Sequence, residues 1–146
     1  MKTKLLILSA ALFSLITISC KSDATKCVDN MIETIANAKS VEDLEKISSA
    51  SDIFFSLYKP RYDNGEEYKQ YMHDVVNELI DRFDEIRVAG KNNINLKVKG
   101  FSFASESEMK ERCESLHEWI NEAEVSIDEN KVTIKNGWEV ITFSKD

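Results

Sequence analysis

The chain has 146 residues, of which 42% are hydrophobic and 31% are charged, and it contains four glycines and one proline. The length suits one globular domain, and the apolar share is too high for a chain that is disordered throughout. The scarcity of glycine and proline disfavours collagen-like, linker-like and turn-dense sandwich folds and favours long helices. The formal charge is −7, and nucleic-acid binding needs clustered positive charge, so no nucleic-acid partner is expected.

The first twenty residues have the layout of an export signal. Two lysines in residues 1–4 precede an uncharged run over residues 5–18, which is too short to span a bilayer comfortably. The run leads into Thr17-Ile18-Ser19-Cys20, which resembles the lipobox of bacterial lipoproteins. The resemblance implies that residues 1–19 are removed as a signal peptide and that Cys20 becomes the lipidated N-terminus. An ordinary secretory signal or an uncleaved anchor is the alternative.

The same resemblance implies a place in the bacterial cell envelope. Several acyl chains on Cys20 would hold the protein stably, whereas a single chain binds a membrane only marginally. Lys21-Ser22-Asp23 follows the cysteine. A lysine after the lipidated cysteine is usual in lipoproteins sent to the outer membrane, and the stretch resembles the surface-export tags of Bacteroidota lipoproteins. Residues 1–19 contain two lysines and no acid, so residues 20–146 form a single domain with a formal charge of −9.

Apolar residues recur at three- and four-residue steps in four segments of this domain. The pattern predicts helices over 24–38, from Ser40 to Pro60, over 66–89 and over 105–123. Ser40 with Asp43, and Ser105 with Glu108, have the spacing of a capping box. Gly90 is expected to end the third helix as its C-cap.

The rest of the domain predicts β-structure. Apolar and polar residues alternate over 94–98, which predicts a strand with a bend at Gly100. Asn136-Gly137 predicts a hairpin turn that pairs Lys135 with Trp138. A further turn at residues 129–130 adds a third strand, and one face of this sheet is then apolar: Val125, Ile127, Val132, Ile134, Ile141 and Phe143. If the last helix instead runs to Ile127, only a hairpin remains. The predicted fold is α+β, with about four helices packed on a small C-terminal antiparallel sheet or hairpin.

Cys27 and Cys113 both lie on the apolar faces of predicted helices. In an exported protein such an even pair is a candidate disulfide. Two buried free thiols that pack as small apolar side chains are the alternative.

Motifs for catalysis or metal binding are incomplete. The segment from His117 to Asn121 resembles the zincin helix motif but has asparagine where the second histidine ligand belongs. Glu114 and His117 have a di-iron ligand spacing, yet a di-iron bundle needs such a pair twice. Cys113 and His117 are four residues apart, but the thiol faces the core. No catalytic residue, metal or cofactor is therefore expected.

Tyrosines gather around one loop. All four lie within fourteen residues: Tyr58, Tyr62, Tyr68 and Tyr71. Three of them also fit helical stripes. Tyrosine, tryptophan and arginine are enriched at recognition surfaces, so Arg61, Tyr62 and Trp138 are the candidate contacts with a protein partner.

The sequence thus predicts a lipid-anchored, non-catalytic interaction module whose ligand it does not identify. Two alternatives stay open. One is a periplasmic inhibitor or immunity-type lipoprotein. The other is an enzyme with an unrecognised site that uses Arg61, Tyr62, His73 or His117.

Overall fold

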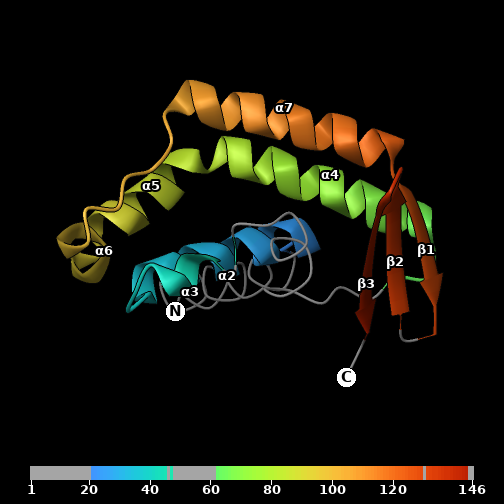
Figure 1. The fold of residues 1–146 in the computed structure, drawn as a ribbon, viewed down its shortest axis with the longest axis horizontal. Helices are drawn as coiled ribbons and strands as arrows, with labels where there is room; N and C mark the ends of the chain where they lie inside the picture. The colour runs from blue at the N-terminus through green and yellow to red at the C-terminus, as the bar shows by residue number, and fades with distance from the viewer. Residues whose placement is uncertain (1–20, 46, 48–61, 130, 145–146) are drawn as a thin grey trace, which may run out of the picture.

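The computed structural model describes residues 21–45, 47, 62–129 and 131–144. It shows an α+β fold, as predicted, with helices at one end and a three-stranded antiparallel sheet at the other (Figure 1). The described helices are α2 (Asp23–Asn37), α3 (Glu42–Glu45), α4 (Gly65–Asp81), α5 (Phe83–Asn92), α6 (Ile94–Val98) and α7 (Glu106–Glu122). The strands are β1 (Glu124–Asp128), β2 (Lys131–Asn136) and β3 (Glu139–Ser144).

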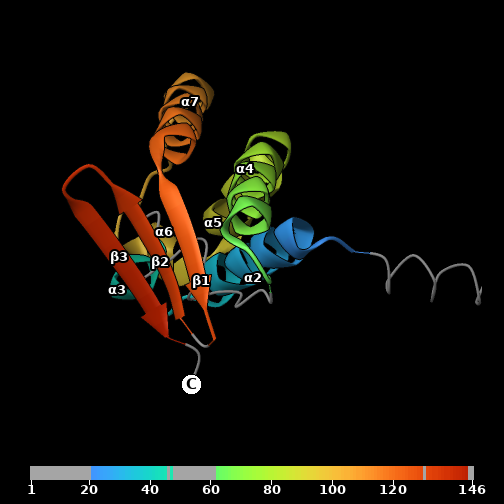
Figure 2. The same cartoon turned by 90° about the vertical axis from the view of Figure 1, so that its right-hand side faces the viewer.

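Helix α4 is the centre of the helical part. Helices α2 and α7 pack on opposite sides of it, as the end-on view in Figure 2 shows. Its predicted apolar stripe is buried almost completely: Tyr68, Tyr71, Met72, Val75, Val76 and Leu79. Burial of such side chains contributes about 1.5 to 3 kcal/mol each, so this stripe accounts for much of the stability of the fold.

The sheet lies across one end of the helices and follows the order β1-β2-β3. The predicted apolar face is confirmed, because all six of its residues belong to or pack against the core. The β1–β2 register is also confirmed, with Ile127 opposite Val132. The β2–β3 register is wrong, since Asn136 pairs with Glu139 and the turn residues are Gly137 and Trp138. Gly137 has φ 56° at the first turn position, as a type II′ turn requires.

The predicted helix over 66–89 is two helices, because Arg82 interrupts it with φ −108° and ψ 17°. The second helix also continues past Gly90 to Asn92, so Gly90 is not a C-cap. The glycine is needed for another reason. A β-carbon on Gly90 would overlap the ring of Phe103, which packs directly against this turn of α5.

The predicted strand over 94–98 is wrong, because these residues form helix α6. Asn93 begins the helix by accepting hydrogen bonds from the backbone N–H groups of Asn95 and Leu96. Gly100, with φ 69°, ends it in a Schellman arrangement, in which its N–H bonds to the Lys97 carbonyl and the Phe101 N–H to the Leu96 carbonyl. Of the three alternating apolar side chains, only that of Leu96 is buried.

The three remaining helix predictions have different outcomes. Helices α2 and α7 confirm the predictions to within one residue at each end, and α7 has the predicted capping box of Ser105 and Glu108. The helix predicted from Ser40 is described only as the four residues of α3, and residues 48–61 lie outside the described part. The alternative of an α7 that extends to Ile127 is wrong, because residues 124–128 form β1.

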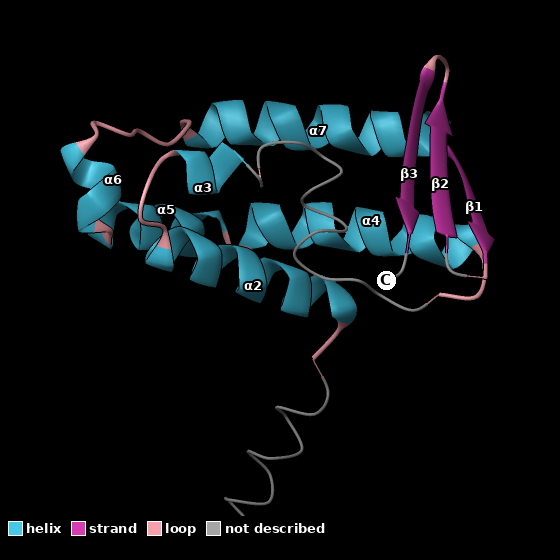
Figure 3. Ribbon diagram, turned by 60° about the horizontal axis from the view of Figure 1, so that its bottom comes forward, coloured by secondary structure: helices cyan, strands magenta, loops and turns pink. Residues whose placement is uncertain are grey.

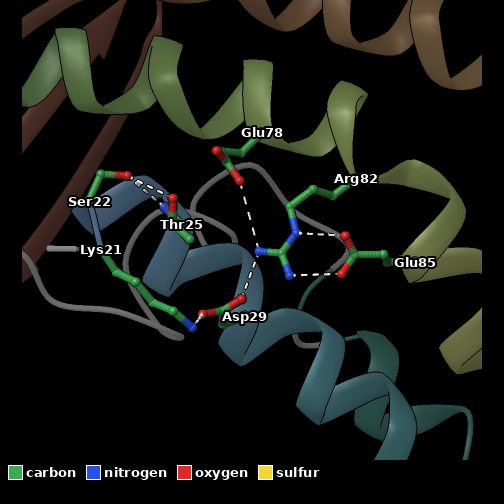
Figure 4. A network of polar contacts seen from close by, with 7 residues as sticks. All are labelled: Lys21, Ser22, Thr25, Asp29, Glu78, Arg82 and Glu85. Atoms are coloured by element: carbon green, nitrogen blue, oxygen red, sulfur yellow. Dashed lines mark hydrogen bonds and ion pairs between the residues drawn. The ribbon is translucent and has the colours of Figure 1, made fainter. Parts of the chain in front are cut away.

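A polar network joins α2 to the junction of α4 and α5 (Figure 4). The Arg82 guanidinium donates to Asp29 on α2 at 2.7 Å and to Glu85 on α5 at 2.9 Å. Asp29 also accepts from Lys21 at 2.8 Å. Burial raises the pKa of Asp29, but the hydrogen bonds from Lys21 and Arg82 outweigh it and hold that pKa below its usual value. The network therefore favours the interrupted helix, in which Arg82 can reach two other helices.

Figure 3 shows how far apart the two ends of the molecule are, with the sheet at one end and α6 at the other. Among the residues that the structure describes, no helix combines the length and the apolar character needed to cross a membrane.

Candidate functional site

Of the three predicted partner contacts, the structure describes Tyr62 and Trp138. Arg61 lies outside the described residues, as does Cys20, for which the sequence predicts lipidation. Tyr62 is half-buried; its hydroxyl donates to Asp23 at 2.8 Å and its ring contacts those of Tyr68 and Tyr71. Tyr62 therefore packs against α2 and α4, and its contact with a partner stays a prediction.

Trp138 is fully exposed at the tip of the β2–β3 hairpin. The sequence paired Trp138 with Lys135, but the register places Trp138 in the turn. Residues 94–98 are at the opposite end of the molecule (Figure 3). Trp138 is accessible to a partner, yet of the described apolar side chains only Val140 is similarly exposed on this hairpin.

Cys27 and Cys113 are both buried and free, so the structure has the two thiols and not the disulfide. Helix α4 lies between the helices that carry them, α2 and α7 (Figure 1). Burial raises the pKa of Cys27 to about 11, against the opposing effect of a hydrogen bond with Tyr71. Burial also raises the pKa of Cys113. Neither thiol is activated as a nucleophile, because both thiolates are disfavoured.

One hollow lies at the α6 end of the molecule. Its volume is about 540 Å³, and we call it the basic groove. Helix α5, helix α6 and the segment that leads into α7 form its walls: Arg87, Gly90, Lys91, Lys97, Phe101, Ser102, Phe103, Ala104 and Ser105. A volume of this size is typical of sites for small organic ligands. A second hollow, of about 200 Å³ between α4, α5 and α7, is smaller than that range.

The basic groove has a charge opposite to that of the whole chain. Of the described residues that line it, three are cationic and none is acidic. Arg87 pairs with Asp84 at 2.8 Å, and its buried Nε atom has no hydrogen-bond partner among the described residues. Lys91 and Lys97 are exposed and make no ion pair or side-chain hydrogen bond within the described part of the chain. They also lie in the last turns of α5 and α6, where cations stabilise the helix dipoles.

Two phenylalanines form the apolar wall of the groove. Phe101 and Phe103 meet edge to face, with ring centroids 5.0 Å apart at 80°. Phe103 packs on Gly90 and the core, whereas Phe101 is 37% exposed. The turn at Gly100 brings both rings beside α5. Sequence analysis missed the groove because it read this turn as a bend in a strand.

A second polar arrangement joins α4 to α7. His73 Nδ1 and His117 Nδ1 are 2.7 Å apart, and His117 Nε2 lies 3.0 Å from Asn77 Oδ1. The His73 ring bonds to the Asn121 side chain. An amide oxygen only accepts, so His117 is protonated at Nε2 and, when neutral, accepts from His73 at Nδ1. The sequence signal was present: each histidine is followed four residues later by the asparagine that its counterpart uses.

In this His–Asn network, three ring nitrogens have a described contact: His73 Nδ1, His117 Nδ1 and His117 Nε2. Burial, followed by the charge of His117, lowers the pKa of His73 below its usual value, while Asn121 acts in the opposite direction. The structure brings His73 and His117 together, whereas Tyr62 contacts Asp23 and Tyr71; an enzyme site that uses these residues stays a prediction. Within the described ranges, no three His, Cys, Asp or Glu side chains gather as a metal site.

Comparison with known proteins gives no relative: no family model, curated protein or solved structure matches this chain.

Proposed function

We propose that the chain is a lipid-anchored, non-catalytic binding module of a bacterial cell envelope. Acyl chains on Cys20 would hold it in the outer membrane, facing the periplasm or the cell surface. Its binding site would be the basic groove, at the end of the molecule farthest from the sheet.

The lipobox-like stretch Thr17-Ile18-Ser19-Cys20 carries the proposal of an anchor, and the chain between Cys20 and the fold is short. Helix α2 begins at Asp23, so only Lys21 and Ser22 separate the two. Both of these residues are already engaged, because Ser22 caps α2 and Lys21 pairs with Asp29 (Figure 4). Three Cα steps reach about 11 Å at most. A lipid on Cys20 would therefore keep α2 against the membrane surface.

Metabolic labelling tests the anchor. The full chain is expressed in a bacterial host with an alkyne-bearing fatty acid, and the labelled protein is detected after conjugation to a dye. The wild type is expected to be labelled and Cys20→Ser is expected to lose the label. Cys113→Ser is the matched control, since it also removes one thiol but keeps Cys20. Equal labelling of wild type and Cys20→Ser would overturn the anchor.

A further inference from the structure

We propose that the basic groove binds a small organic anion with an aromatic body, whose charged group lies between Lys91 and Lys97 and whose ring packs on Phe101. The inference rests on the binding part of the proposed function and is independent of the lipid anchor.

The groove lining is positively charged, although the chain as a whole is acidic. The chain has 26 acidic residues, yet the described lining of the groove contains Arg87, Lys91 and Lys97 and no carboxylate. Among the described contacts, Arg87 alone of the three has an ion pair, with Asp84. The other two cations face solvent from two different helices, α5 and α6, at the rim of one hollow. A protein with a surplus of acids could pair both lysines internally, so two unpaired lysines at a hollow favour an external anion.

The groove also contains hydrogen-bond donors without a described acceptor. The Nε atom of Arg87 is buried without a hydrogen-bond acceptor among the described residues. A buried donor without a partner costs about 1 to 3 kcal/mol. The backbone N–H groups of Ser102 and Phe103 also lack a described backbone acceptor. A ligand with acceptor oxygens could bond to several of these donors at once.

The apolar wall of the groove determines which uncharged group the ligand should carry. Phe101 is part of the groove lining, exposes more than a third of its surface and is held edge to face against Phe103. The Phe103 ring is fixed in turn by Gly90, which leaves no free space below it. The Phe101 ring is thus supported from one side by the Phe103 ring, and an aromatic ligand can pack against its exposed side. A planar aromatic group fits this wall, and about 540 Å³ accommodates one or two rings.

Calorimetric titration of the full chain in dodecyl maltoside tests the inference, with micelles alone as the blank. Three probes separate the two parts of the ligand. They are 2-naphthalenesulfonate, its neutral isostere 2-naphthalenesulfonamide, and methanesulfonate, which has the charge without the ring. We expect one molecule of the aromatic sulfonate per chain and at least about tenfold weaker binding of each other probe. Equal binding of sulfonate and sulfonamide would overturn the role of charge, and equal binding of the two sulfonates would overturn that of the ring.

Variants locate the site. Lys91→Gln with Lys97→Gln is expected to weaken binding of 2-naphthalenesulfonate about fivefold, as the loss of two exposed ion pairs would. Phe101→Ala is expected to weaken it by a similar factor. Lys131→Gln with Lys135→Gln, on exposed positions of β2, makes the same change of charge at the other end and should leave binding unchanged. If the β2 pair weakens binding as much as the groove pair, the anion binds through net charge and the proposed site is wrong.

A lipid headgroup shares the anionic part of this chemistry. Dihexanoyl phosphatidylglycerol, which dissolves as monomers, is therefore titrated in the same way. Tighter binding of this lipid than of the aromatic sulfonate would overturn the assignment to an aromatic anion. Failure of all probes would reject the groove as a ligand site, while the labelling of Cys20 would still decide the anchor.

Discussion

At the scale of single residues, the two histidines determine how the contact between α4 and α7 depends on pH. With the Nδ1 atoms 2.7 Å apart, there is room for one proton between the rings. A second proton would place two N–H groups against each other and add like charges. The groups nearest His73 are His117 and Lys69, which disfavour its protonation, and Asp74, which favours it.

We therefore expect stability to fall as the pH drops below about 6.5, the ordinary pKa of histidine. The folded pKa of His73 is lowered, so the unfolded state binds more protons in this range and protonation favours unfolding. Thermal unfolding followed by circular dichroism at pH 7.5 and 5.5 measures the effect on the full chain in detergent. His73→Gln and His117→Gln should each reduce the pH dependence. The chain has only these two histidines, so a dependence that persists in both variants would contradict the prediction.

Asn93 is another residue whose contacts the sequence did not reveal. It is 6% exposed, and its amide nitrogen donates to the carbonyl oxygens of Ile35, Ala36 and Ala38 at the end of α2. Its amide oxygen meanwhile caps α6. One side chain thus satisfies the C-terminal carbonyls of one helix and the N-terminal N–H groups of another.

Asn93→Ala is expected to lower the free energy of unfolding by about 2 to 3 kcal/mol, because a helix cap is lost and buried carbonyls lose their donor. Urea denaturation measures the change. Asn92→Ala, at the exposed last residue of α5, is the control and should cost less than about 0.5 kcal/mol. Asn93→Asp separates the two roles, since it keeps the oxygen that caps α6 and removes the donor. A small effect of Asn93→Ala would mean that water replaces its contacts.

At the scale of elements, helices α2 and α7 and the β1–β2 pairing were predicted, whereas the continuous helix over 66–89 and the strand over 94–98 were not found. Helices α2 and α7 have three or more turns of apolar periodicity and clear caps, and both were predicted. The alternation over residues 94–98 is only five residues long, and α6 contradicts it because Asn93 and Gly100 cap a helix there. The β2–β3 register was wrong because Gly137 supplies the positive φ one position earlier in the turn than assumed.

The interruption at Arg82 had no signal in the periodicity. Arg82, at the interruption, makes an ion pair with Asp29 on α2, which is a long-range contact between residues 53 positions apart. The groove was likewise not predictable, since the turn at Gly100 brings Phe101 and Phe103 beside α5 only once α6 is a helix. Contacts of this kind depend on the arrangement of elements and not on the local pattern.

The first turn of α4 shows how the helices are attached to the sheet. A β-carbon on Gly65 would overlap the carbonyl oxygen of Val125 on β1. The overlapping oxygen belongs to the backbone of Val125, so rotation of a side chain cannot relieve the overlap. Gly65 is thus required for the close approach of α4 to the sheet.

Gly65→Ala is expected to destabilise the protein by about 2 kcal/mol or more, because β1 must move away from α4. Urea denaturation measures the cost, and the amide exchange rates of β1 report the local effect. Gln70→Ala, exposed on the same helix, is the matched control and should cost about 0.5 kcal/mol or less. Unchanged stability of Gly65→Ala would show that the contact between Gly65 and Val125 is loose in solution.

At the scale of the whole molecule, the packing of α2 and α7 on opposite sides of α4 keeps the two buried thiols apart. Cys27 belongs to the α2–α4 interface and Cys113 to the buried face of α7 on the far side of α4. A disulfide would have to pass around the most buried helix of the fold. The protein is therefore expected to keep both thiols even in an oxidising envelope, which is where disulfides normally form.

Thiol labelling with Ellman's reagent tests this arrangement on the Cys20→Ser chain, which has only these two cysteines. In guanidinium without reductant, two thiols per chain are expected. In the native state the reaction should be at least about 100-fold slower than for a cysteine introduced by Ser126→Cys on the exposed face of the sheet, because even an opening free energy of about 3 kcal/mol produces that factor. A mass two hydrogens lower without reductant, or native thiols that react as fast as the introduced one, would contradict the packing of α2 and α7 on opposite sides of α4.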